Sequence, residues 1–166
     1  MRSLYLIRHA IAEERDAWRH PDHLRPLSQA GWRQAAALAD LLAEAGIEAH
    51  HSSPSTRCRD TLLPLAHAGA LAVIDDLRFA EGSASELDEG ALRGLLGELM
   101  ADGRRRVCAC SHGDVIPQWL AAAGVRSGGR CPKGGVWRLD LPDGKPKVTQ
   151  AVYLGRPDPA GGWDPR

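Results

Sequence analysis

Four side chains suited to phosphate chemistry stand where apolar segments give way to polar ones. Arg8 and His9 come directly after one apolar run, and His112 comes after another. Arg57 follows shortly after another predicted strand, 47–52. Guanidinium groups match phosphate oxygens with paired, charge-assisted hydrogen bonds. A histidine beside such positive charges is pushed towards its neutral form, whose ring nitrogen can attack phosphorus and form a phosphohistidine. These residue types therefore predict chemistry at a phosphoryl group.

A carboxylic acid is also needed, because the departing oxygen must gain a proton and the water that follows must lose one. Glu81 lies in the loop after the third predicted strand, and we assign it this role from its place in the sequence. Glu86, Asp76 and Asp88 lie close enough along the chain to compete with it. The choice among these carboxylates stays open at the level of sequence.

Other groups near these residues are candidates for binding the substrate. Gly113 lies in the segment 112–114, which is predicted to open a helix whose free amide groups would contribute to an anion site. Arg15 lies in the first long loop, which also contains the basic residues Arg19, His20, His23 and Arg25. These loop residues either contact the remote part of a substrate at the rim of a pocket or are simply solvated. The sequence does not decide between the two.

Alternating strands and helices must bring these residues together. Apolar runs predict the strands, and capping residues with 3.6-residue periodicity predict the helices between them. The predicted strands are 4–7, 47–52, 71–75, 106–110, 136–141 and 148–153. The predicted helices are 28–46, 55–68, a segment that includes 92–99, and 114–123. Pro64 predicts a kink or an early end in the second of these helices.

An alternation of this kind gives right-handed crossovers and a mainly parallel sheet covered by helices on both faces. We therefore predict an α/β fold, a three-layer α/β/α sandwich with a mainly parallel sheet and an antiparallel C-terminal edge. Ligands bind beyond the carboxyl ends of the strands in such folds. The side chains of Arg8, His9, Arg57, Glu81 and His112 should converge there.

The composition sets limits on the class of protein. The chain has 166 residues with 21 basic and 21 acidic side chains, so no global charge favours a nucleic-acid polymer or a polybasic membrane anchor. No apolar run approaches the length of a membrane helix, and Met1–Ile7 lacks the pattern of a secretion signal. We expect a cytoplasmic protein with no membrane or nucleic-acid partner and with its four cysteines reduced.

The domain organisation follows from length and from the composition of the last residues. The length is that of one domain. Six of the last twelve residues are Gly or Pro. We therefore expect one domain over 1–154 and a flexible tail over 155–166. The sequence leaves the oligomeric state open, as monomer or dimer.

Four short motifs surround the candidate residues: Arg8-His9-Ala10, LSQAGWRQA at 27–35, SSPSTR at 52–57 and Ser111-His112-Gly113. They resemble the Arg-His-Gly signature, the Leu-Thr-x-x-Gly-x-x-Gln-Ala stretch, the Ser-Ser-Pro-x-x-Arg element and the second histidine of the histidine phosphatase superfamily, in its phosphoglycerate-mutase-like branch. They occur in the family's order and extend over most of the chain. Each motif is weak alone, and together they are specific.

Two kinds of member are more closely similar. The chain resembles small phosphohistidine phosphatases of the SixA type in size. The segment Trp18–Leu27, the residues Arg57-Cys58-Arg59 with Thr61, and KGGVW at 133–137 look like the phosphatase half of actinobacterial Nudix–histidine phosphatase fusions. Only that half is matched, so the substrate of the fusions need not carry over.

The resemblance implies a role for each candidate residue. His9 would be the nucleophile, Arg8, Arg57 and His112 would hold the phosphoryl group, and Glu81 would be the acid. It implies a phosphohydrolase that needs no metal or other cofactor and forms a phosphohistidine on His9. The substrate would be a phosphomonoester, a nucleotide or a phosphohistidine protein. Ala10 departs from the family's usual glycine, and the chain has little room for the inserts of the larger mutases.

Other readings of the same residues are possible. His50 and His51 would point to opposite faces of a strand, and Cys108 and Cys110 fit packed thiols, so we expect no metal site. The chain has no Gly-x-x-x-x-Gly-Lys-Ser/Thr loop of a nucleoside triphosphatase. Two rival functions remain: a non-hydrolytic binder of phosphorylated ligands, and a signalling module that passes a phosphoryl group from His9 to a partner protein.

Overall fold

The computed structural model describes residues 1–83, 87–126 and 129–165, so the competing acid Glu86 lies outside the described residues. One sheet contains seven strands in the order β3-β2-β4-β1-β5-β6-β7. The strands are β1 Arg2–Arg8, β2 Ala49–Ser52, β3 Val73–Asp75, β4 Arg106–Ser111, β5 Val136–Leu141, β6 Gln150–Pro157 and β7 Trp163–Asp164. The helices are α1 Gln29–Leu42, α2 Thr56–Ala68, α3 Glu89–Leu99 and α4 Ile116–Ala122, with 3-10 turns η1 Asp22–Leu24, η2 Ala43–Ala45 and η3 Leu77–Phe79.

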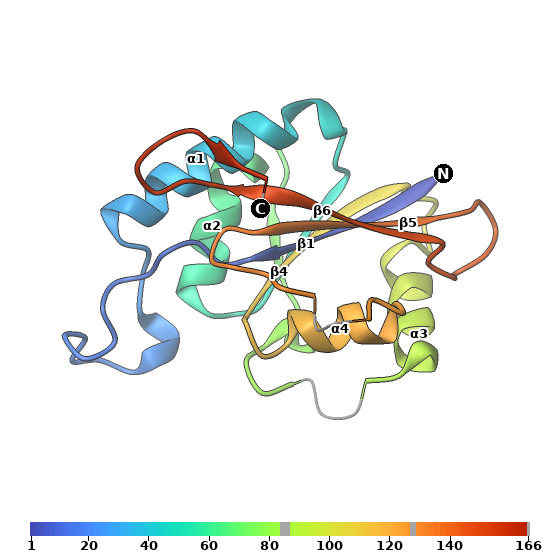
Figure 1. Cartoon of the computed structure of the whole chain (residues 1–166), viewed down its shortest axis with the longest axis horizontal. Coiled ribbons are helices and arrows are strands. Elements are labelled where there is room, and N and C mark those ends of the chain that lie inside the picture. Colours follow the sequence, from blue (N-terminus) through green and yellow to red (C-terminus); the bar gives the residue numbers. More distant parts are fainter. Residues whose placement is uncertain (84–86, 127–128, 166) are drawn as a thin grey trace.

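The predicted three-layer α/β/α sandwich is confirmed. β1 to β4 run parallel, and β5, β6 and β7 add an antiparallel edge. Helices α1 and α2 cover one face of the sheet, and α3 and α4 cover the other (Figure 1). All six predicted strands are present, β5 with the predicted ends and the other five with shifted ends, and β7 is an addition that the sequence did not predict.

The alternation of side chains along β1 explains why its sequence is apolar throughout. Leu4 and Leu6 point into the core under α3 and α4, whereas Tyr5 and Ile7 point into the core under α1 and α2. Successive residues of a strand face opposite sides, so a strand covered on both faces needs apolar side chains at every position. The run 4–7 is therefore a signature of the central strand of this sandwich.

The register of β1 against β4 sets the position of both candidate histidines. Arg8 pairs with Ser111 across the two parallel strands, and the His9 backbone N–H donates to the Ser111 carbonyl at 3.0 Å. His9 and His112 are thus the first residues beyond two neighbouring strand ends. Their rings lie 5.5 Å apart between centroids, in an edge-on arrangement.

The LSQAGWRQA segment holds the loop that follows β1 against the start of α1. Ser28 caps α1, since its hydroxyl accepts from the Gly31 N–H at 3.1 Å and donates to the Ile11 carbonyl at 2.9 Å. The Gln34 side-chain oxygen accepts from the Ile11 N–H at 3.0 Å. A Cβ on Gly31 would lie 1.9 Å from the Ile11 carbonyl oxygen. The motif therefore positions the loop through direct backbone contact.

α2 runs through Pro64 to Ala68, so of the two outcomes expected at this proline the early end is wrong. The expected start of the last helix is also wrong. α4 begins at Ile116 and not near Asp114, so the segment 112–114 is a turn before the helix. The amide groups of this turn are outside the helix that we expected them to open.

The described part of the segment 155–166, which we expected to be a flexible tail, contains regular strands. β6 continues into it, and β7 folds back to pair with β6. The Trp163 indole N–H donates to the Leu154 carbonyl at 3.0 Å, and its ring packs against the core under α1 and α2. Gly161 and Gly162 have φ of 113° and 89°, which the turn between β6 and β7 requires. The glycines that suggested mobility instead form a hairpin turn.

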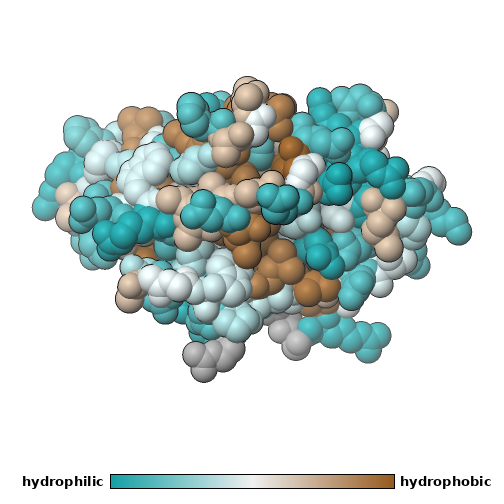
Figure 2. All heavy atoms as spheres, turned by 90° about the horizontal axis from the view of Figure 1, so that it is seen from above, coloured by the Kyte–Doolittle hydropathy of each residue, from teal (hydrophilic) through white to brown (hydrophobic). Residues whose placement is uncertain are grey.

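The surface is mixed in character. Figure 2 shows one face on which hydrophilic residues predominate at the ends and hydrophobic residues gather towards the middle. Among the described residues, no helix combines the length and apolar character needed to cross a bilayer.

Gly31→Ala tests whether the close approach of α1 to the loop is required. The added methyl group collides with the Ile11 carbonyl, and overpacking of this kind costs about 1–3 kcal/mol of unfolding free energy. Gly94→Ala is the matched control, because a Cβ at this position in α3 meets no atom within 4 Å. The control should gain about 0.5–1 kcal/mol from the better helix propensity of alanine. Urea unfolding measures both variants, and equal effects would contradict the contact.

Candidate active site

A cavity of about 460 Å³ lies beyond the carboxyl ends of β1 and β4. All seven residues singled out from the sequence line it: Arg8, His9, Arg15, Arg57, Glu81, His112 and Gly113. Glu13, Glu14, Arg25, Asp114 and Lys133 are among the other lining residues. The structure thus brings together residues that are more than a hundred positions apart in the chain.

His9 is held as a neutral imidazole with a defined tautomer. Its ring is buried, and its Nδ1 lies 2.8 Å from the Ala10 carbonyl oxygen. A carbonyl oxygen can only accept, so Nδ1 carries the proton and Nε2 carries the lone pair. The pKa of His9 is lowered to about 3, mainly by burial; the Ala10 hydrogen bond opposes this effect, and the nearby Arg57, His112 and Arg8 add to it. Nε2 is therefore an unprotonated ring nitrogen at neutral pH.

The first turns of α2 tie this loop to Arg57. The Thr61 hydroxyl accepts from the Ala10 N–H at 3.0 Å and donates to the Arg57 carbonyl at 2.7 Å. Ala10 itself is fully buried against Leu27 and Ala35. The position of His9 is therefore fixed from both sides by backbone hydrogen bonds.

Arg57 is the most deeply buried charged group of the cavity, with 1% of its surface exposed. One of its terminal nitrogens donates to the backbone carbonyl of Asp22 at 3.0 Å and lies 3.2 Å from the Asp22 carboxylate. The other donates to Glu81 Oε2 at 2.8 Å and lies 3.4 Å from His112 Nδ1. Because Arg57 can only donate, Nδ1 of His112 accepts, and His112 Nε2–H donates to the Ser53 hydroxyl at 2.8 Å.

Arg8 lies across the backbone of Gly113. A Cβ on Gly113 would lie 2.7 Å from the guanidinium carbon of Arg8, so a larger residue here would displace the Arg8 side chain from this position. Arg8 donates to the Cys131 carbonyl at 3.0 Å. Its Nε is buried and has no hydrogen-bond partner among the described residues. The Ser111-His112-Gly113 motif therefore provides His112 and also the space that the Arg8 side chain occupies.

Glu81 lies at the cavity, in the loop after η3. Its carboxylate contacts Arg57, and its second oxygen lies 3.8 Å from Arg15. The next residue anchors the loop, since the Gly82 N–H donates to the Asp114 carboxylate at 2.8 Å. The loop after β3 thus reaches over to the end of β4.

The competing carboxylates in the described chain have other partners. Asp76 accepts from His51 at 3.0 Å and pairs with Arg78. Asp88 caps α3 by accepting from the Ala91 N–H at 2.7 Å. Neither lines the cavity. Glu81 is therefore the acid of the predicted group that the described structure places there.

Several residues at the site were missed by the sequence analysis as contributors. Ser53 and Thr61 stand within the motifs, and only the structure shows that their hydroxyls hold His112 and the loop after His9. Lys133 lies in the KGGVW segment and lines the cavity. Asp22 lies within the segment Trp18–Leu27 that resembles the fusions, but it was assigned no role from the sequence. Its contact with Arg57 depends on how the loop before α1 folds.

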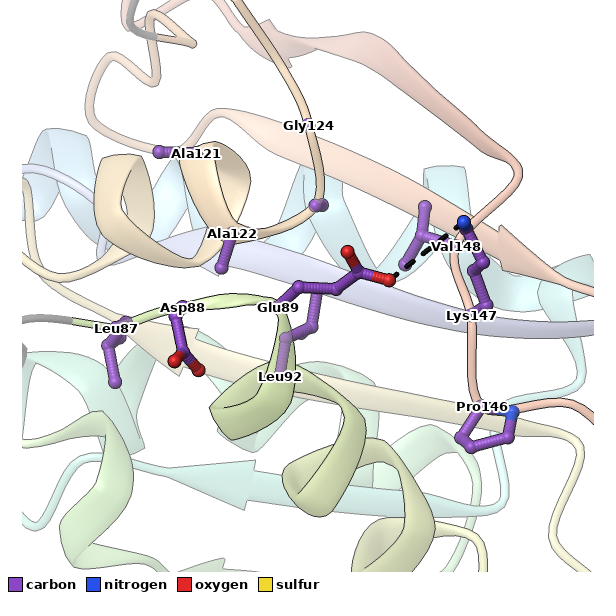
Figure 3. Close-up of a pocket in the computed structure, with 11 residues that line it drawn as sticks. Leu87, Asp88, Glu89, Leu92, Ala121, Ala122, Gly124, Pro146, Lys147 and Val148 are labelled. Carbon is purple, nitrogen blue, oxygen red and sulfur yellow. Dashed lines mark ion pairs between the residues drawn. The ribbon is translucent and has the colours of Figure 1, made fainter.

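A separate cavity of about 490 Å³ lies between the start of α3, the end of α4 and the turn before β6 (Figure 3). Its charged lining includes Glu89 and Lys147, which lie 3.9 Å apart and form an ion pair. Within the described chain, its lining contains no histidine, cysteine or arginine. Both candidate histidines, with Arg8 and Arg57, line the other cavity.

Two further histidines, His50 and His51, have buried partners at the sheet. His50 Nδ1 lies 2.9 Å from Cys108 Sγ, and all four cysteines are buried free thiols. Within the described ranges, no three His, Cys, Asp or Glu side chains are grouped so that they could hold a metal ion.

Comparisons with known proteins agree with this geometry. The family model of the histidine phosphatase superfamily (branch 1) matches residues 4–92. A curated relative, the 8-oxo-(d)GTP phosphatase of Mycolicibacterium smegmatis, is 32% identical over 164 residues, which are 95% of this chain and 49% of that protein. The chain therefore spans about half the length of this relative.

Solved structures show the same fold at low sequence identity. A mycobacterial glucosyl-3-phosphoglycerate phosphatase in complex with VO3 is similar with a TM-score of 0.70 and 20% identity, over 92% of this chain and 97% of that chain. The protein histidine phosphatase SixA complexed with tungstate is similar with a TM-score of 0.69 and 17% identity, over 95% of this chain and 97% of that chain.

The pKa of His9 predicts a loss of stability in acid. The unfolded chain binds a proton at His9 near pH 6.5, whereas the folded chain does so only near pH 3. Unfolding is therefore favoured as the pH falls through this window, by about 2 kcal/mol between pH 7 and pH 5. Urea unfolding of His9→Asn should show a pH dependence that is smaller by this amount.

His67→Asn is the matched control, because this histidine is exposed at the end of α2. It should keep the pH dependence of the unsubstituted protein. A His9→Asn variant with the same pH dependence as this control would contradict the neutral, buried state of His9.

Proposed function

Because the chain belongs to the histidine phosphatase superfamily (branch 1) and is a phosphatase, we propose that it hydrolyses its substrate through a phosphohistidine on His9, without a metal ion. The observation that carries this proposal is the neutral His9, whose unprotonated Nε2 lies in a cavity with Arg8, Arg57 and His112. A nucleophile and two guanidinium groups able to hold phosphoryl oxygens are thus present in one place, with His112 hydrogen-bonded to one of them.

In the first step, Nε2 of His9 attacks phosphorus and the bond from phosphorus to the leaving oxygen breaks. Arg8 and Arg57 stabilise the charge on the phosphoryl oxygens, as preorganised donors do in a transition state. Glu81 gives its proton to the leaving oxygen. In the second step, water attacks the phosphohistidine while the Glu81 carboxylate takes a proton from it. Inorganic phosphate then leaves, and His9 returns to its neutral form.

The contact between Glu81 and Arg57 links substrate binding to the role of the acid. The Glu81 carboxylate occupies one terminal nitrogen of Arg57 at 2.8 Å. Phosphoryl oxygens that bind Arg57 compete for the same donor, so binding releases the Glu81 carboxylate from this ion pair. The released carboxylate takes up a proton from solvent or from the bound phosphoryl group and then gives it to the leaving oxygen.

The substrate is assigned less closely than the chemistry. We propose a phosphorylated small molecule, with nucleotides and other phosphomonoesters as the classes to test first. The relative named 8-oxo-(d)GTP phosphatase supports a nucleotide, although this chain covers only about half of that protein. A phosphohistidine protein, as in the similar structure of SixA, is the alternative class.

His9→Asn should abolish hydrolysis of p-nitrophenyl phosphate in the presence of EDTA. Loss of the nucleophile removes the covalent step, and the rate should fall by roughly 10⁴-fold or more. The measurement is the release of nitrophenol, together with acid-labile labelling of the unsubstituted protein by a radioactive phosphoryl donor. His67→Asn should keep full activity.

Three results would overturn the proposal. Turnover that persists in purified His9→Asn protein would exclude His9 as the nucleophile. Turnover of the unsubstituted protein that stops with EDTA would exclude the metal-free route. A stable phosphoprotein without release of phosphate would favour a phosphotransfer module.

Glu81→Gln should slow the hydrolysis of substrates with poor leaving groups more than that of p-nitrophenyl phosphate. A nitrophenolate leaves with little need of a proton, whereas the alkoxide of glycerol phosphate needs one, and general acid catalysis contributes roughly 10²–10⁴-fold. Asp22→Asn is the matched control, because its carboxylate also contacts Arg57. The control should affect both substrates alike, and an equal loss on both with Glu81→Gln would remove Glu81 from this role.

A further inference from the structure

A second cavity, of about 560 Å³, adjoins the one that contains His9. The two cavities share Arg8, Gly113 and Lys133 in their linings. The second cavity extends from these residues towards Arg130 and Arg156. A molecule with one end beside His9 can therefore extend past Arg8 into it.

The charges of the two cavities differ. Carboxylates line the first cavity beside its basic residues, including Glu13, Glu14, Glu81 and Asp114. The lining of the second cavity includes four basic side chains and, within the described chain, no Asp or Glu. Positive charge gathered without carboxylates favours an anionic ligand.

The basic side chains of the second cavity have hydrogen-bonding capacity to spare. The Nε atoms of Arg8 and Arg156 are buried and find no hydrogen-bond partner among the described residues. Arg156 pairs with Asp164 at 3.6 Å through a terminal nitrogen, so this ion pair does not engage its Nε. A buried donor without a partner needs an explanation. An acceptor bound in the second cavity would provide one for these two of the four arginine Nε atoms in this state.

Lys133 also experiences the positive electrostatic potential of the nearby arginines. Partial burial and the nearby guanidinium groups of Arg8, Arg25 and Arg15 lower the pKa of its ammonium group, and Glu14 offsets this only in part. A bound anion would relieve this repulsion. Arg8 lines both cavities, and its guanidinium group lies against the Gly113 backbone. A ligand that occupies both cavities would therefore contact Arg8.

We infer that the second cavity binds a second anionic group of the same substrate, so the substrate is a small molecule that carries a phosphate or carboxylate beside the phosphoryl group to be removed. This inference rests on the proposed function of the first cavity. The combined space suits a small ligand, since ligand cavities usually measure about 300–1,000 Å³. The terminal phosphoryl group would lie at His9, and the second anionic group would lie among Arg8, Arg130, Lys133 and Arg156.

Arg130→Gln tests the inference, because Arg130 lines the second cavity and not the first. Three substrates are compared: p-nitrophenyl phosphate, which has no second anionic group; ADP, which has a second phosphate; and 3-phosphoglycerate, which has a carboxylate. The variant should lower kcat/KM for ADP or for 3-phosphoglycerate about tenfold through KM, since a hydrogen bond to a charged group is lost. It should leave p-nitrophenyl phosphate within about twofold. The arm that responds identifies the second group.

A binding measurement keeps the test independent of which substrate is hydrolysed. Pyrophosphate should bind more tightly than orthophosphate to the unsubstituted protein, and Arg130→Gln should reduce this advantage about tenfold. Arg93→Gln, an exposed arginine on α3, is the matched control for loss of one positive charge and should change nothing.

The outcomes separate the two proposals. Failure of the unsubstituted protein to hydrolyse p-nitrophenyl phosphate contradicts the proposed function, and the pyrophosphate comparison still tests the second cavity. Hydrolysis of p-nitrophenyl phosphate, with an Arg130→Gln variant that changes all substrates alike or leaves the pyrophosphate advantage intact, overturns the second anion site alone.

Discussion

The burial of Arg57 is the constraint on which the architecture of the site depends. A guanidinium group with almost no exposed surface is costly unless its donors are satisfied. Its partners come from three different places: Asp22 before α1, Glu81 after β3 and His112 after β4. Three loops that are distant in the chain must therefore meet around one side chain. The cavity exists where they meet.

The same positive charges serve binding and nucleophilicity. Arg8 and Arg57 attract an anionic phosphoryl group, and they also disfavour a proton on His9. Burial is the largest cause of the lowered pKa of His9. The Ala10 carbonyl then determines that the remaining proton is on Nδ1. A site that is more basic thus becomes better at holding phosphate and at keeping its histidine ready to attack. This explains why two arginines and two histidines can share one small space.

The sequence predicts the sheet and the convergence of its strand ends because apolar runs and strand alternation are local signals. It fails where the outcome depends on distant contacts. The Gly- and Pro-rich end looks mobile, yet Trp163 finds a place in the core and a carbonyl to donate to. Asp22 looks like a loop acid until the loop folds over Arg57. The start of α4 also depends on the turn after His112, which only the three-dimensional structure defines.

The LSQAGWRQA motif contains residues that take no part in the proposed reaction but whose side chains position the loop after β1. Gln34 accepts from the Ile11 N–H and donates to the Pro157 carbonyl at 2.8 Å, so one side chain joins the loop after His9 to the C-terminal strand β6. Ile11 and Arg156, the neighbour of Pro157, both line the second cavity. A change in the packing of α1 would therefore alter the shape of the cavities by moving the backbone at Ile11 and Pro157. The hydrogen bonds of Gln34 that stabilise the fold thus also position residues that line the second cavity.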